Sequence, residues 1–221
     1  MRVTFVVLAA TVAATVAAAL PFACAAQSAG IVAIGGNLVP SSCTLSVDAG
    51  GVSFGDIALS EFNDAGGTAQ PDSRATQVRV ACTGPTLLAL RIRDNRHDTL
   101  TGADDGNPRV FGIGLADSGS QLGAYRITPA VDGLVNGAPG PILRSGDMAA
   151  WVAGSSDWAK YNVATPVGHA FLSPGAGTAP TATTTAIIPV SVALTLAPLA
   201  SLQLTQRTVI DGSATVEMIY L

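Results

Sequence analysis

Few side chains in this sequence have the types and spacing that catalysis or metal binding requires. The two histidines, His97 and His169, are far apart, and no further metal-ligating residues cluster with either. No serine lies in a G-x-S-x-G elbow, and the zinc-binding pattern H-E-x-x-H does not occur. A Ser-His-Asp triad could be assembled in space from either histidine, but almost any exported β protein allows that. We therefore expect no catalytic site, no cofactor and no metal, and we keep a secreted enzyme as a remote alternative.

Two stretches have residue types that suit ligand binding. The acidic segment 98–107 does not have the spacing of a calcium loop, and turn-forming residues explain it more simply. Trp151 and Trp158 flank a small polar loop, with Tyr161 close behind them. Exposed aromatic rings can stack on sugars, although such residues more often pack in a core. These three aromatic residues are the candidates for binding a host glycan or matrix component.

The first 26 residues have the pattern of a signal peptide. Met1-Arg2 is positively charged, the run from Val3 to Leu20 is almost entirely apolar, and small residues follow at positions 23–26. We expect cleavage after Ala26 or one residue earlier. The alternatives are an uncleaved anchor helix, since the run has about the roughly 20 residues that a membrane span needs, and a lipid-attachment cysteine at Cys24. The polar residues after Ala26 disfavour the first, and the residues preceding Cys24 make a poor lipobox.

Cleavage would leave Cys43 and Cys82 as the cysteines of the exported chain. Two cysteines in an oxidising compartment predict one disulfide, and the alternative is two unpaired buried thiols. In the chain-entropy model, a loop of this length would stabilise the fold by about 4 kcal/mol. The exported chain has 10 basic and 15 acidic residues, because Arg2 is lost from the 11 basic residues, and its net charge is −5. This balance, with no run of basic residues, argues against nucleic acid or an anionic membrane surface as a partner.

The elements that would position these residues are strands, because alternation of apolar and polar residues dominates the chain. The longest alternating run extends from Ile188 to Leu196, Leu202 and Leu204 follow as a further alternating pair, and the chain ends in another run at 215–221. Glycine and proline separate such runs. The sequence therefore predicts one all-β domain with a sandwich or barrel architecture. Because proline cannot donate to a ladder, Pro189 suggests an edge strand or a strand entry. A short helical turn is considered at 147–152.

An apolar strand at the start of the exported chain has no partner in its own neighbourhood. Gly30, Val32, Ile34, Gly36 and Leu38 share one face of the extended segment. Such a strand must join a sheet or become an aggregation hazard.

This pattern resembles the N-terminal extension of chaperone–usher pilus subunits, in which alternating apolar residues and glycines precede a cysteine. Cys43 and Cys82 match the family's cysteine pair, and Val216, Met218, Tyr220 and Leu221 match its C-terminal strand with a penultimate tyrosine. The stretches 93–96, 111–114 and 211–215 also resemble one uncharacterised family of pilin-like proteins encoded beside fimbrial genes. Many pilins place a glycine farther from the C-terminus than Gly212, so the boundaries of the last strand are open.

The resemblance implies an immunoglobulin-like β-sandwich that lacks its last strand, an incomplete pilin fold with one disulfide. After the signal peptide at 1–26, it implies a donor-strand extension at 27–40 and the pilin-like domain at 41–221. A periplasmic chaperone would pair with the C-terminal strand. At an outer-membrane usher, the N-terminal extension of the next subunit would then replace the chaperone. The implied protein is a structural subunit of a fimbria, exported through the periplasm to the cell surface and supporting adhesion.

The alternative function is that of a minor or tip adhesin that binds a glycan or matrix component through the loops at 136–180.

Lys160 is the only lysine of the chain. A single lysine argues against the lysine-based covalent linkage that joins some bacterial surface fibres.

Overall fold

The computed structural model describes residues 35, 41–48, 51–62, 66–161 and 169–221. The chain divides into two units, Met1–Leu38 and Val39–Leu221, and the strands and helices described below belong to the second. The predicted signal peptide and the predicted donor-strand residues Gly30, Val32, Ile34, Gly36 and Leu38 lie outside the described residues.

The second unit is built almost entirely of strands, which confirms the all-β prediction. The strands are β1 Cys43–Val47, β2 Arg74–Thr86, β3 Leu88–Asp94, β4 Phe111–Gly112, β5 Gly123–Pro129, β6 Asp132–Val135, β7 Ala138–Ser145, β8 Phe171–Ala176, β9 Ala179–Pro180, β10 Thr183–Leu196 and β11 Ala214–Tyr220. The helical elements are the short turns η2 Leu59–Glu61, η3 His97–Thr99 and α1 Leu199–Leu202. Within the described ranges, no helix is long and apolar enough to cross a membrane.

The strands form two layers that are joined along one side. One layer contains β1, β2 and β10, with β5 pairing the far half of β10 and β4 pairing β5. The other contains β8, β3 and β11. The β6–β7 hairpin connects them, because β6 pairs with β10 and β7 pairs with β8. The hydrogen-bonded path therefore starts at β1 and ends at β11, giving a sandwich-like fold.

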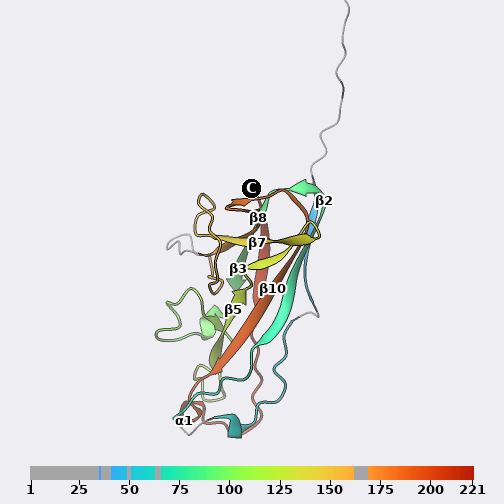
Figure 1. Ribbon diagram of the computed structural model, residues 1–221. Coiled ribbons are helices and arrows are strands. Elements are labelled where there is room, and N and C mark those ends of the chain that lie inside the picture. Colours follow the sequence, from blue (N-terminus) through green and yellow to red (C-terminus); the bar gives the residue numbers. More distant parts are fainter. Residues whose placement is uncertain (1–34, 36–40, 49–50, 63–65, 162–168) are drawn as a thin grey trace, which may run out of the picture. The chain divides into compact units, whose positions relative to one another are not determined.

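The long strand β10 organises the first layer. Figure 1 shows β2 and β10 running side by side, with α1 at one end of this unit and the C-terminus at the other. Along β10, the residues from Ala186 to Leu196 at every second position are buried, so their side chains form the core.

Pro189 lies in a central strand, contrary to the expectation of an edge. Its partner on β2 is Gln77, and its carbonyl accepts a hydrogen bond from the Ala130 N–H. On that side, β10 pairs with β6 at Ala186–Ile187 and with β5 from Val190 onward. The missing N–H of Pro189 therefore falls at the junction between two pairing strands, where the ladder is interrupted anyway.

Two local expectations were wrong. Residues 147–152 form no helix, because the chain turns at Met148, whose φ is +64°, and Val152 pairs back with Arg144 through two backbone hydrogen bonds. Leu202, which we listed with Leu204 among the alternating strand-like residues, ends the short helix α1 and is buried in the core.

Candidate functional site: an open seam between β1 and β11

The two ends of the strand path leave a seam, which we define as the interval between the outer edges of β1 and β11. In the described part of the chain, β1 pairs with β2 alone and β11 pairs with β3 alone. Each strand therefore presents one row of backbone N–H and C=O groups toward the seam. Such rows are templates for pairing with a further strand.

Core side chains beside the seam are incompletely covered. In β10, the inward-facing residues are fully buried, whereas in β11 no residue is fully buried. Val216 and Met218 pack against the core yet keep part of their surface exposed, as do Cys43 and Leu45 of β1. Val47, at the end of β1, is 39% exposed. The core is therefore open along the line where one more strand would cover it.

A groove of about 220 Å³ lies in this opening. No charged side chain is among its described lining residues. Its polar side chains are those of Thr76 and Tyr125, because the indole N–H of Trp158 is already bonded to the Ala170 carbonyl. Burial raises the pKa of Tyr125, as does the nearby charge of Asp94, so this phenol stays neutral. One wall consists of Val47, Val52 and Phe54, the other of Ile210, Ala214 and Val216, and the floor includes Val78, Ile92, Ile127, Val190, Val192 and Leu194.

The groove continues toward the end of the unit that holds α1. Val52, Phe54 and Ile210 also line a second cavity of about 720 Å³, which extends to Leu59 and Leu204. At the opposite end, the backbone N–H of Cys43 donates to the phenolic oxygen of Tyr220, at 3.2 Å. One end of the seam is thus bridged by a side chain, and the other opens into a larger space lined by both apolar and polar side chains.

Polar contacts between the stretches 93–96 and 211–215 hold the start of β11. Both stretches carried the family resemblance. The Asn95 N–H donates to the Ser213 carbonyl at 2.9 Å, and the Asn95 side-chain amide donates to the Thr215 hydroxyl at 3.0 Å. Arg96 forms an ion pair with Asp211 and also donates to its carbonyl. These contacts place Ala214 and Val216 on the groove wall.

The sequence-predicted site residues have different locations. Cys43 and Cys82 face each other across β1 and β2 and form the predicted disulfide, so this prediction is confirmed. Val216, Met218 and Tyr220 lie in β11 beside the seam. Leu221 follows the strand, and its N–H donates to the Leu87 carbonyl.

The three aromatic residues proposed for a ligand loop do not share one surface. Trp158 is 1% exposed, and its indole N–H donates to the Ala170 carbonyl in the core. Trp151 and Tyr161 are half-buried on the outer face of the second layer, where they pack around Phe171. In this arrangement, Trp158 contributes to packing and has no surface to offer a ligand.

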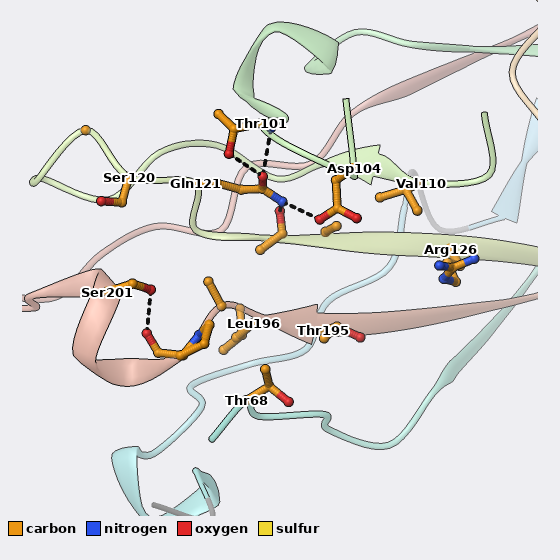
Figure 2. A pocket seen from close by; sticks show the side chains of 15 residues that line it. Thr68, Thr101, Asp104, Val110, Ser120, Gln121, Arg126, Thr195, Leu196 and Ser201 are labelled. Atoms are coloured by element: carbon orange, nitrogen blue, oxygen red, sulfur yellow. Dashed lines mark hydrogen bonds between the residues drawn. The ribbon is translucent and has the colours of Figure 1, made fainter. Parts of the chain in front are cut away.

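A polar cleft of about 540 Å³ lies elsewhere, near the end of β10 (Figure 2). Its central side chain, Gln121, accepts two hydrogen bonds from Thr101 and donates to Asp104 and to the Gly123 carbonyl. All hydrogen-bonding positions of this amide are therefore used within the protein. Gln121 acts as a structural link between two loops, and the described residues that line the cleft offer no free side-chain amide to orient a ligand. Among the described residues, no group of three or more metal-ligating side chains is present.

Sequence reasoning identified the C-terminal strand of the groove and missed most of its floor and one wall. Val52 and Phe54 belong to an irregular segment that pairs with no described strand. Their alternation with the exposed Ser53 and Gly55 was the one available signal. Ile210 and Gly212 precede β11 in a similar irregular segment.

The fold and the site together define the class of protein as an all-β sandwich with an apolar seam between its two edge strands. Residues 32–111 match the model of a family described as "Protein of unknown function (DUF1120)". The chain is 30% identical over 111 residues to Protein GltF of Escherichia coli (strain K12), covering 42% of this chain and 44% of GltF. It is 26% identical over 229 residues to Uncharacterized protein YhcF of the same organism, covering 90% of this chain and 94% of YhcF. The chain thus spans less than half of GltF and nearly all of YhcF.

Proposed function

We propose that this protein is a structural subunit of a surface fimbria, assembled by strand donation between copies. The observation that carries the proposal is the apolar groove between β1 and β11, with strand edges on both sides and a partly exposed core beneath. A strand inserted there would cover the core and pair with both edges, because backbone hydrogen bonds provide affinity and side-chain pockets provide register.

The segment Gly30–Leu38 has the properties of such a strand. Val32, Ile34 and Leu38 would enter the groove as apolar side chains, and Gly36 would lie where a larger side chain would clash. At roughly 3.3 Å per residue, its nine residues span about 30 Å, against about 23 Å for the 7 residues of β11. The additional length would reach toward the second cavity beside Leu59.

A contact in which one copy donates its strand and the next accepts it is heterologous. Such a contact does not close on itself, and repetition builds a fibre. The newly exported subunit would need a periplasmic chaperone to cover the groove, and an outer-membrane usher to exchange the chaperone for the next subunit. These partners, and the location at the cell surface, are part of the proposal.

A complementation experiment with two variants of the exported chain tests it. A donor-deficient variant lacks residues 30–38. An acceptor-blocked variant has Val216→Glu, which places a charge in the groove, and its control has Ala193→Glu on the exposed face of β10. All are expressed in the native host, and the assemblies are measured by native mass spectrometry and electron microscopy.

Each single variant should fail to form fibres, while the Ala193→Glu control should form them. A mixture of the two variants should give dimers and stop there, because only the blocked copy can donate and only the deleted copy can accept. Fibres formed by the donor-deficient variant alone would exclude the donor role of this segment. Fibres formed by Val216→Glu alone would exclude the groove as acceptor.

A further inference from the structure

The single lysine of the chain is enclosed beside a buried carboxylate. The Lys160 side chain is 13% exposed and that of Asp94 is 1% exposed, and Nζ lies 3.6 Å from Asp94 Oδ2. Nζ also donates to the Val110 carbonyl at 2.6 Å and lies 5.6 Å from the centre of the Phe111 ring. A primary amine and a carboxyl group are thus held together in a site largely shielded from water.

The Asp94 carboxyl group is held in place by backbone donors on both of its oxygens. The Arg96 N–H donates to Oδ1 at 2.9 Å, and the Gly112 N–H donates to Oδ2 at 3.0 Å. These donors fix the orientation of Cγ relative to Nζ. If a nucleophile attacked Cγ, negative charge would develop on a carboxyl oxygen, and the two N–H groups already point at these oxygens. Preorganised N–H groups in such positions stabilise a tetrahedral intermediate.

His97 and the carboxylate of Asp105 lie in line with the amine of Lys160. His97 Nδ1 lies 3.4 Å from Lys160 Nζ, and His97 Nε2 lies 3.4 Å from Asp105 Oδ1. With Nε2–H directed at Asp105, Nδ1 is free to accept a proton from the amine. The order carboxylate, imidazole, nucleophile is the arrangement by which a general base activates a nucleophile.

We propose that Lys160 and Asp94 form an intramolecular amide bond, with His97 as the proton carrier. The ammonium and the carboxylate first exchange a proton within the pair, giving a neutral amine and a neutral carboxyl group. The amine electron pair then attacks Cγ, and His97 takes a proton from Nζ. His97 returns that proton to the departing hydroxyl, and one water leaves as the Nζ–Cγ bond is completed. No oxidant, reductant or further reactant is needed.

Three physical effects favour the reaction at this position. Burial lowers the pKa of Lys160, opposed by the charge of Asp94, so the neutral amine becomes more accessible than at a protein surface. Holding the two groups in contact replaces a bimolecular encounter with an effectively unimolecular step. The product also removes two charges from a buried site, where they are costly.

The bond would covalently join the end of β3 to the segment preceding β8. The disulfide already links β1 to β2 in the other layer, so each layer would carry one covalent connection. The single lysine excludes repeated lysine links between many sites, but an internal bond needs only this one.

Peptide mapping of the purified exported protein tests the proposal. Trypsin cuts after lysine and arginine, and an amide at Lys160 would block cleavage there. We expect a branched peptide in which Asp94–Arg96 is attached to the intact stretch Ser145–Arg207, lighter than its parts by one water. Recovery of separate linear peptides ending at Lys160 and starting at Tyr161, with no branched species, would overturn the proposal.

Variants separate the bond from the groups that promote it. Lys160→Arg keeps the positive charge and should abolish the branched peptide. His97→Ala alters an exposed side chain and should slow formation by about 10²-fold, measured as the cross-linked fraction at fixed times after synthesis. His169→Asn, at the other histidine, is the control and should leave the rate unchanged. An unchanged rate in His97→Ala would exclude His97 as the proton carrier.

Discussion

The backbone N–H of Cys43 donates a hydrogen bond to the phenolic oxygen of Tyr220, at 3.2 Å. Cys43 is the first residue of β1 and Tyr220 is the last of β11, so this contact joins the two ends of the strand path. It spans the seam at the end nearest the C-terminus. The disulfide from Cys43 to Cys82 anchors one side of this contact, and the ladder between β11 and β3 anchors the other.

Removing the phenolic oxygen should have a small effect on stability. Tyr220 is 54% exposed, so water competes for the hydrogen bond, and Tyr220→Phe should lower the free energy of unfolding by less than about 1 kcal/mol. The Cys43 amide should exchange its hydrogen faster, which hydrogen–deuterium exchange measures directly. A loss of several kcal/mol in urea unfolding would show that the contact holds the layers together.

Loss of the disulfide should have a large effect. Its cysteines are separated by 39 positions, and the double change Cys43→Ser, Cys82→Ser should lower the free energy of unfolding by about 4 kcal/mol. Since β1 has no other strand partner than β2 among the described strands, its edge should also lose protection in hydrogen exchange. Ala81→Ser, at an exposed β2 position, is the control. Equal unfolding midpoints for the double variant and the wild type would contradict the prediction.

The strands could be predicted from sequence because their signal is local. Alternation along 188–196 and 215–221 identified the strands that became β10 and β11. Their neighbours could not be predicted in this way, since pairing depends on residues far apart in the chain. Pro189 illustrates the limit: a local rule placed it at an edge, whereas a junction between β5 and β6 accommodates it in the centre.

The candidate site was predictable on one side only. Val216 and Met218 belong to a regular strand, whereas Val52 and Ile210 reach the groove from irregular segments that form no strand. The proximity of Lys160 to Asp94 was likewise hidden, because η3, β4 and the segment before β8 must first come together. Local sequence patterns do not specify such long-range contacts.

The aromatic residues provide a test of the adhesin alternative. Trp158→Ala should cost about 3–5 kcal/mol of unfolding free energy, because it empties a buried site in the core. Trp151→Ala, in a half-buried cluster, should cost about 1 kcal/mol. Urea unfolding measures both. If the well-folded Trp151→Ala variant lost binding on a glycan array that the wild type shows, the adhesin alternative would replace the structural role.

Acidification should destabilise the fold through His169. Burial lowers the pKa of His169 below its ordinary value of 6.5, and the nearby charges of Arg109 and Arg144 lower it further. The unfolded chain therefore binds this proton more readily than the folded chain. The contribution of neutral His169 is fully present above pH 6.5 and is lost as the pH falls from there toward the lowered pKa.

His169→Asn should remove this component of the pH dependence. Asparagine suits the position because the backbone φ of His169 is +73°, in the left-handed region that asparagine tolerates. The comparison is made by urea unfolding at constant ionic strength over a series of pH values. The carboxylates of Asp48 and Asp147 have pKa values lowered from 3.8, by a hydrogen bond from Arg79 and by backbone N–H groups respectively. Their contribution is lost only below that value, in a separate range. A wild-type stability that rises on acidification just below pH 6.5, or an equal slope in His169→Asn, would show that this histidine is not the group responsible.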